Sequence, residues 1–251
     1  PPNHSAFSTP IELLHFIKML RDQSGGKPVG FKLCIGRRIE FMNICKAMIK
    51  TGITPDFITI DGAEGGTGAA PLEYSNRFGM PINEGLAFAH NCLVGSGVRD
   101  KMRIIASGKV ATGFDMIMKI ALGADMVNQA REMMFSVGCI QALRCHTNTC
   151  PTGVATQDPK RTRALVVEDK GPHVRNYHEL TMKSFLDMVG AMGLNSPDEL
   201  KPSMIFYRLN EGDSLPFTEL FHYIEPGHFL NNDNIHPFFA DIWKNADASH
   251  F

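Results

Sequence analysis

The chain has 251 residues, 43% hydrophobic and 20% charged, which predicts a soluble protein with at least one sizeable core. Its 25 Lys and Arg residues balance 26 Asp and Glu residues, so no field of a single sign would draw it to nucleic acid or to an anionic membrane. The sequence contains no apolar run long enough to span a bilayer, and its N-terminus does not resemble a signal peptide, so we expect a cytoplasmic protein.

Four strand–helix pairs follow an initial helix. That helix begins at Thr9-Pro10-Ile11-Glu12, where the threonine and the glutamate form a capping box around a first-turn proline. Short β-rich segments predict strands at 29–34, 57–60, 103–106 and 125–130, and apolar spacing predicts helices at 38–50, 86–93, 113–122 and 133–143. Thr112 and Asp115 are suited to cap the third of these helices.

This alternation predicts an α/β fold with a parallel sheet, because parallel neighbours need a crossover and the helices must bury their apolar faces. Two architectures remain open, a doubly wound sheet and part of a (β/α)8 barrel. Beyond residue 158 we expect a C-terminal extension over 159–251, with helices at 175–192 and 196–199. From residue 202 the chain is rich in aromatics, Pro, Asn and His, and we expect it to drape over the body with little regular structure.

Three segments that follow predicted strands are suited to bind a ligand. The loop DGAEGGTGAAP (61–71) either brings backbone N–H groups close to an anion or a flat ring, or is a flexible connector. The segments ASGKVATG (106–113) and NQAREM (128–133) lie where the last two strands of a barrel would form a phosphate site. Lys109 and Arg131 would add positive charge there, or they are solvated surface cations.

Lys32 lies within an otherwise apolar strand, VGFKLC. Because an unpaired buried ammonium is costly, the side chain either extends outward to water or enters a polar site. Its position in the middle of the strand favours the polar site.

Three of the six cysteines, Cys139, Cys145 and Cys150, are spaced C-x5-C-x4-C. Clustered cysteines in a reducing compartment are typical of metal or catalytic sites. Three thiolates suit an iron–sulfur cluster with three irons; a zinc site that includes His146 and a set of unligated thiols are the alternatives. We expect Cys34, Cys45 and Cys92 in the core.

The segments FKL, DGAEGGTGAAP, RIIASGKVATG, ALGAD and GCIQALRCHTNTCPTGVATQ, in this order, resemble the FMN-binding synthase domain of glutamate synthase, in particular its stand-alone members. The resemblance covers residues 1–158. It implies a (β/α)8 TIM barrel with FMN at the carboxyl ends of its strands and a [3Fe-4S] cluster beside it, of which this chain supplies about four C-terminal strand–helix units. The cluster ligands of the family fall on Cys139, Cys145 and Cys150.

The same resemblance implies a set of pocket residues. Lys32 would lie in the flavin and substrate pocket as a catalytic residue, and His4, in the segment PPNHSAFSTP, is a second candidate from the family's active-site loop. The remaining cofactor-binding residues are Gly65, Gly66 and Thr67 beside the pocket, and Ser107, Gly108, Lys109, Ala130 and Arg131 near the FMN phosphate.

The function that the resemblance implies is FMN-dependent reductive amination of 2-oxoglutarate to glutamate, with the cluster feeding electrons to the flavin. An amine in place of ammonia would give an N-alkylglutamate. The alternative is a non-catalytic fragment or electron-transfer module that keeps the cluster without flavin. No glutamine amidotransferase domain is visible, so ammonia would come from solution or from another subunit.

Half a barrel exposes two strand edges and part of an apolar interior. We therefore expect the missing half to come from a longer native chain, from another subunit or from a second copy, and the start at PPNHSAF without a methionine suggests a fragment. An electron donor protein or a reductase subunit would be a further partner. Nucleic acid and membranes are not expected partners.

Overall fold

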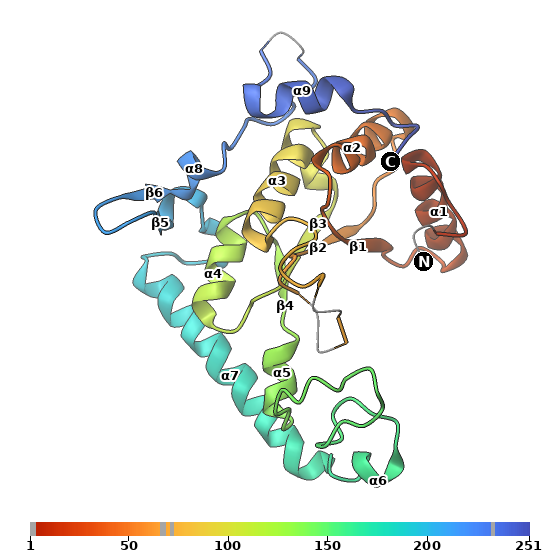
Figure 1. The fold of residues 1–251 in the computed structure, drawn as a ribbon. Coiled ribbons are helices and arrows are strands. Elements are labelled where there is room, and N and C mark those ends of the chain that lie inside the picture. Colours follow the sequence, from red (N-terminus) through yellow and green to blue (C-terminus); the bar gives the residue numbers. More distant parts are fainter. Residues whose placement is uncertain (1–3, 66–68, 71–72, 232–233) are drawn as a thin grey trace.

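The computed structural model describes residues 4–65, 69–70, 73–231 and 234–251. Its centre is a parallel four-stranded sheet in the order β1-β2-β3-β4 (Figure 1). The strands are β1 Gly30–Cys34, β2 Phe57–Asp61, β3 Arg103–Ser107 and β4 Met126–Asn128. The α/β class with a parallel sheet is therefore confirmed. The strand order follows the chain without the reversal that marks a doubly wound sheet.

One helix precedes the sheet and three connect successive strands, and local sequence signals set where they begin. They are α1 Pro10–Gln23, α2 Arg38–Thr51, α3 Ile82–Gly95 and α4 Gly113–Ala121, with a 3-10 turn, η1, at Arg99–Lys101. Both predicted caps form: Thr9 Oγ1 accepts a hydrogen bond from the Glu12 N–H, and Thr112 Oγ1 accepts one from the Asp115 N–H, each at 3.2 Å. Each cap satisfies a helix N–H that has no partner within the helix.

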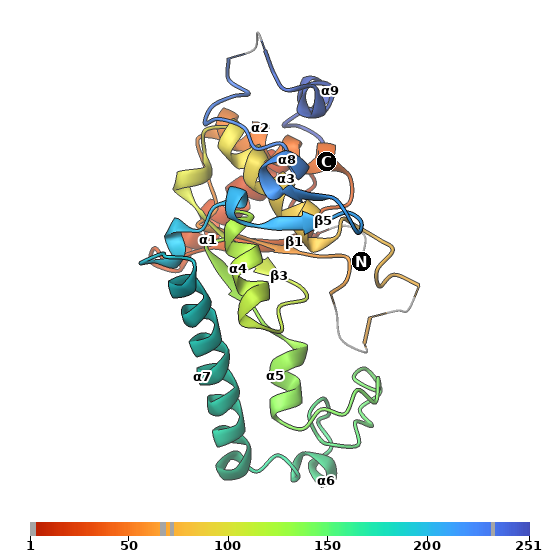
Figure 2. The same ribbon diagram turned by 90° about the vertical axis from the view of Figure 1, so that its left-hand side faces the viewer.

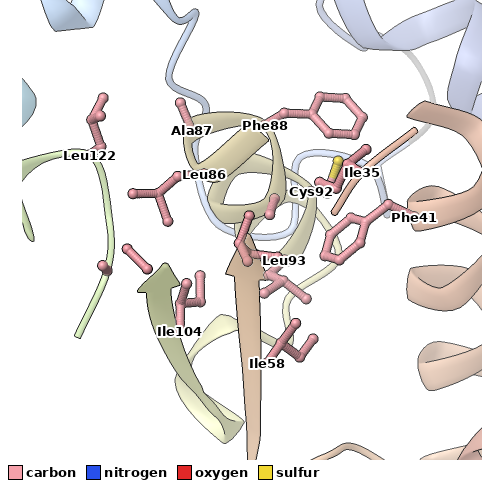
Figure 3. Packing of buried hydrophobic residues seen from close by; sticks show 14 of the residues in the cluster. Ile35, Phe41, Ile58, Leu86, Ala87, Phe88, Cys92, Leu93, Ile104 and Leu122 are labelled. Atoms are coloured by element: carbon pink, nitrogen blue, oxygen red, sulfur yellow. The ribbon is translucent and has the colours of Figure 1, made fainter. Parts of the chain in front are cut away.

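The core lies between the sheet and helix α3. Ile58, Ile104, Leu86 and Leu93 are completely buried, and Figure 3 shows the two isoleucines on the strands below the two leucines of α3. Side chains alternate across a strand, so the opposite face of the sheet carries Lys32 and its neighbours in the register. We call this second surface the open face.

The segment after β4 departs from the predicted helix at 133–143. Helix α5 covers only Arg131–Ser136, and the prediction of helix beyond it is wrong. Gly138, Gln141 and Leu143 all have a positive φ, of 103°, 57° and 54°, and a right-handed helix excludes that conformation. The chain therefore leaves the helix just before the cysteines.

Two further helices complete this part of the molecule. They are the short α6, Pro159–Thr162, and the long α7, Val167–Ala191. Helix α7 begins eight residues before the predicted start at 175, because it continues through Pro172 near its first turn. It packs against α4 and α5, and its N-terminal half projects from the sheet together with α5 and α6 (Figure 2).

The C-terminal segment contains more regular structure than expected. It includes the 3-10 turns η2 Pro197–Glu199 and η3 Pro202–Met204, the antiparallel hairpin of β5 Phe206–Arg208 and β6 Ser214–Pro216, and the helices α8 Phe217–Leu220 and α9 Pro237–Asn245. The expectation of an irregular tail is thus wrong, although the segment does lie on the body. Phe229 and Phe239 are buried in the same hydrophobic cluster as α2 and α3, because aromatic side chains gain from leaving water. In the described residues no helix combines the length and apolarity needed to cross a membrane.

Candidate functional site

The carboxyl ends of the four strands form one row. Cys34, Asp61, Ser107 and Asn128 are successive partners in the parallel register. Residues in one register position share a face of the sheet, so the row lies at the edge of the open face. Its polar composition places hydrogen-bonding groups where α/β folds commonly bind ligands.

Lys32 lies on the open face, two residues before this edge. Its Nζ is 2.6 Å from Asp61 Oδ2, the Lys32 side chain is 56% exposed and that of Asp61 is 19% exposed. The ammonium therefore lies in a polar site on an exposed surface. Sequence reasoning missed Asp61, although a carboxylate at the end of the adjacent strand was the available signal.

Hydrogen bonds hold the first part of the glycine loop. The Gly62 N–H donates to the Ser107 carbonyl at 3.0 Å, and the Gly65 N–H donates to the Gly62 carbonyl at 3.0 Å. A Cβ on Gly62 would lie only 2.9 Å from the Ile82 nitrogen, so this position requires glycine. Gly66 and Thr67 lie outside the described residues.

Glu64 joins three elements of the site, and sequence reasoning missed it. Its Oε2 accepts a hydrogen bond from the Ile82 N–H at 3.0 Å, which caps α3. Its carbonyl accepts a hydrogen bond from Arg131 Nη2 at 2.9 Å. Arg131 is thus tied to the glycine loop and is not a freely solvated cation.

The loop after β3 contains a tight turn next to the glycine loop. Gly108 and Lys109 have positive φ values of 124° and 52°, and a Cβ on Gly108 would lie 3.4 Å from the Gly62 nitrogen. The two loops therefore touch, and backbone N–H groups in turns are common anion ligands. Lys109 is exposed and forms no ion pair among the described residues, and Ala130 is the residue that precedes α5.

Gln129 is a further residue that sequence reasoning missed. Its side-chain nitrogen is buried and has no hydrogen-bond partner in the described part of the chain. A buried amide without a partner is costly. An unpaired donor beside Ala130 and Asn128 therefore fits a site completed by a bound group.

His4 lies apart from this constellation. Its ring stacks on Phe7, with centroids 4.3 Å apart, and its Nδ1 accepts a hydrogen bond from the Ala6 N–H at 3.1 Å. Within the described ranges no hydrogen bond or ring contact joins it to Lys32. Here His4 helps to anchor the N-terminal segment against α1.

The three clustered cysteines line one cavity of about 40 Å³, together with Arg131 and apolar side chains such as Met134 and Leu143. The structure thus brings Cys139, Cys145 and Cys150 together. Arg131 lines the same cavity and also binds the glycine loop. The cysteine cavity and the strand-end loops are therefore directly connected.

Asn148 closes the cysteine loop and was also missed. It has a positive φ of 58°, and its Oδ1 accepts hydrogen bonds from the Gln157 N–H and from Thr156 Oγ1, each at 2.7 Å. Asparagine tolerates this left-handed conformation better than most residues. The contact ties together the segments on either side of Cys150.

Cys150 has an environment suited to a thiolate. Burial opposes ionisation, but hydrogen bonds from the Ala155 N–H, from the hydroxyl and N–H of Thr152 and from the Val154 N–H lower the pKa of the thiol to about 7. Such bonds favour the charged form. Thiolates are the form that binds metals.

Two metal centres were considered for the clustered cysteines. Among residues 4–65, 69–70, 73–231 and 234–251, no group of three or more His, Cys, Asp or Glu is placed to hold a single metal ion. The iron–sulfur cluster and the zinc site with His146 therefore both stay predictions. An iron–sulfur cage binds each thiolate to a separate iron, and three thiols around one apolar cavity fit that arrangement.

The other three cysteines differ in burial. Cys45 and Cys92 are completely buried, as expected, whereas Cys34 is exposed. The core assignment of Cys34 is wrong because its side chain shares the open face with Lys32.

The model of one protein family, described as the conserved region in glutamate synthase, matches residues 1–195. The chain belongs to the glutamate synthase family. The family resemblance of the motifs is thus confirmed, and it extends beyond residue 158 to the end of α7.

Curated relatives support the same family assignment. The chain is 46% identical over 222 residues to the glutamate synthase large subunit-like protein YerD of Bacillus subtilis, covering 88% of this chain and 42% of YerD. It is 31% identical to the archaeal glutamate synthase [NADPH] of Archaeoglobus fulgidus, and the match covers 80% of this chain and 38% of that relative. The chain spans less than half the length of these relatives.

Solved structures show distant similarity. A flavocytochrome b2 variant with benzoylformate gives a TM-score of 0.46 at 18% identity, covering 74% of this chain and 37% of that one. FabK from Thermotoga maritima gives a TM-score of 0.34 at 14% identity, and the match covers 92% of this chain and 65% of FabK. At these values neither carries an argument about function.

Proposed function

We propose that this chain forms the C-terminal half of the FMN-binding (β/α)8 barrel of a glutamate synthase-like oxidoreductase. Family membership supports the proposal, and so does the sequential parallel order of the four strands. The observation that carries it is Arg131, which lines the cysteine cavity and donates to the Glu64 carbonyl in the glycine loop. One side chain thus connects the two places where the cofactors would bind.

The strand-end loops would hold FMN. The turn at Gly108–Lys109, which touches Gly62, offers backbone N–H groups, and the unpaired amide of Gln129 adds a donor. When bound, FMN would supply the hydride that reduces the imine of 2-oxoglutarate and ammonia to glutamate. The chain's own part is to position groups and to fix charge.

Lys32 is the catalytic residue of the proposal. Its ammonium, held by Asp61 at 2.6 Å, would attract a carboxylate of the substrate or stabilise negative charge on the reduced flavin. Asp61 limits the rotamers of Lys32, so less conformational entropy is lost when a ligand binds. His4 is retained as a weaker second candidate.

Cys139, Cys145 and Cys150 would bind a [3Fe-4S] cluster in this proposal. The cluster would pass electrons singly to the flavin from an electron donor protein or a reductase subunit. The hydrogen bonds around Cys150 support this role, because they stabilise the thiolate that a metal requires.

The rest of the barrel is the first partner of the proposal. Met126 is 46% exposed on the open face, and the described sheet has β1 and β4 as its outermost strands. Further strands would pair with both edges and cover this surface. A protein of 27.8 kDa that is monodisperse and monomeric in solution would contradict the need for a second half.

A second candidate function rests on one observation. All three cysteines and the walls of their cavity come from this chain, whereas the open face would supply only part of a flavin pocket. An electron-transfer module that binds the cluster without flavin is therefore the alternative.

Anaerobic purification with quantitation of iron, sulfide and FMN separates the two. Flavin absorption bands with a broad iron–sulfur shoulder support the enzyme, and the shoulder alone supports the module. Cys145→Ser should abolish the shoulder, with Cys34→Ser as the matched control because Cys34 does not line the cavity. A shoulder that persists in Cys145→Ser would show that the ligand assignment is wrong.

A further inference from the structure

A second cavity, of about 260 Å³, lies beside helix α3 and away from the cysteines. Its walls include the rings of Phe88, Tyr207, Phe221 and Phe238. Figure 3 shows Phe88 on the side of α3 that points away from Ile58 and Ile104. This cavity is therefore separate from both proposed cofactor sites.

The cavity exists because the C-terminal segment covers α3. Phe88 comes from the region that the family model matches, residues 1–195, whereas Tyr207, Phe221 and Phe238 come from beyond it. The glutamate synthase region alone would leave this surface open. The C-terminal segment thus forms part of the cavity wall in addition to covering apolar surface.

Arg38 brings a cation to the cavity without an ion-pair partner in the described part of the chain. Its guanidinium carbon lies 4.7 Å from the ring centroid of Phe238 and 5.8 Å from that of Phe88. These cation–π contacts hold the planar group while its N–H groups remain able to bind a carboxylate.

Asn83 adds a donor with a fixed orientation. The buried Lys119 donates a hydrogen bond to Asn83 Oδ1. Because an ammonium only donates, Asn83 must turn its oxygen toward it, which leaves Nδ2 without a partner among the described side chains and backbone. Asn83 lines the cavity, so its amide can assist Arg38 in binding an anion.

Glu84, the next residue on α3, lines the same cavity and forms no ion pair among the residues described. A ligand that carried only a negative charge would meet this carboxylate unfavourably. A ligand with an ammonium as well as a carboxylate would satisfy Glu84 and Arg38 together.

We propose that this cavity binds a free amino acid with a flat aromatic side chain. Arg38 and Asn83 bind the carboxylate, Glu84 binds the ammonium, and the aromatic walls hold the ring. A volume of about 260 Å³ is near the lower limit of small-ligand pockets, roughly 300 Å³. This suits a ligand of the size of one amino acid.

Isothermal titration calorimetry with L-phenylalanine tests the proposal on the 251-residue chain, without need of flavin, cluster or turnover. L-Phenylalanine should bind, and 3-phenylpropanoate, 2-phenylethylamine and L-alanine, which each lack one recognised group, should bind at least ~10-fold more weakly. No binding of L-phenylalanine, or equal binding of any of the three, would overturn it.

Two variants address the charged residues. Arg38→Gln and Glu84→Gln should each weaken L-phenylalanine binding at least ~10-fold. Arg37→Gln is the matched control, because Arg37 precedes Arg38 but does not line the cavity. Binding that is unchanged in Arg38→Gln, or weakened equally in Arg37→Gln, would show that the site is misassigned. Because no cofactor takes part, failure here leaves the proposed oxidoreductase activity untouched.

Discussion

The two faces of the sheet differ in what they contribute. On the helix-covered face, Ile58, Ile60, Ile104 and Ala106 are completely buried beneath the helices. On the open face, Lys32 is more than half exposed, and Asp61 and Ser107 bring polar groups to the strand ends. Neighbouring residues in one strand thus have different roles: the covered side chains stabilise the fold, and the open ones bring polar groups to an exposed surface.

Leu86→Ala on α3 should give the largest effect on stability. Leu86 is completely buried, and removing its methyl groups leaves a cavity that costs about 2–5 kcal/mol in the free energy of unfolding. Urea denaturation followed by circular dichroism measures this loss. The matched control is Leu180→Ala, which removes the same atoms from a side chain that is 67% exposed and should change stability by less than ~0.5 kcal/mol. Equal losses in the two variants would contradict the covered-face assignment.

A buried polar cluster on the covered side predicts a dependence on pH. His90 Nδ1 accepts a hydrogen bond from Arg99 Nε at 3.3 Å. Burial, followed by the charge of Arg99, lowers the pKa of His90 from 6.5 to about 4. The neutral ring is therefore the form that the folded state favours, and protonation favours unfolding.

Stability changes with pH because the folded and unfolded chains bind different numbers of protons at His90. Well above pH 6.5 His90 is neutral in both states and does not affect the free energy of unfolding. As the pH falls from 6.5 toward 4, the unfolded chain binds a proton that the folded chain does not, so stability decreases by roughly 1–2 kcal/mol between pH 7 and pH 5. His90→Gln removes the titration, and its stability should fall less over this range in parallel urea titrations. Identical slopes for the two proteins would contradict the buried neutral histidine.

Local signals in the sequence predicted much of the fold. The caps at Thr9 and Thr112 depend on residues three positions apart, and the strands stand out as short β-rich runs. The glycine loop and the loop at Gly108 follow those strands, so their positions could be predicted too. The motifs also predicted that Cys139, Cys145 and Cys150 come together.

What could not be predicted depends on contacts between distant segments. Asp61 and Lys32 meet because two strands pair in a particular register. Arg131 reaches Glu64 across 67 positions of the chain. Helix α9 packs against α2, and its Phe239 stacks on Phe88 of α3, where the apolar surface makes burial favourable. No local sequence pattern predicts that surface, because it is formed by segments that are distant in the chain.

Lys32→Gln tests the open face directly, although its effect on the free energy of unfolding should be the smallest of the three. The Lys32–Asp61 pair is exposed enough that removing it should change the free energy of unfolding by less than ~1 kcal/mol. If the open face carries the chemistry, the same change in the flavin-loaded protein should lower turnover by roughly 10²-fold, because a positive charge placed at developing negative charge is lost.

Lys27→Gln provides the matched control for this last variant, since Lys27 is exposed before β1 and forms no ion pair among the described residues. Urea titration gives the stability of both variants, and glutamate formation from 2-oxoglutarate and ammonia gives their turnover. A Lys32→Gln protein that unfolds easily would mean that Lys32 is a structural residue. One that keeps full turnover would mean that the open face places its catalytic charge elsewhere. A stable protein with lost turnover would show that adjacent positions in β1 divide stability and chemistry between the two faces of the sheet.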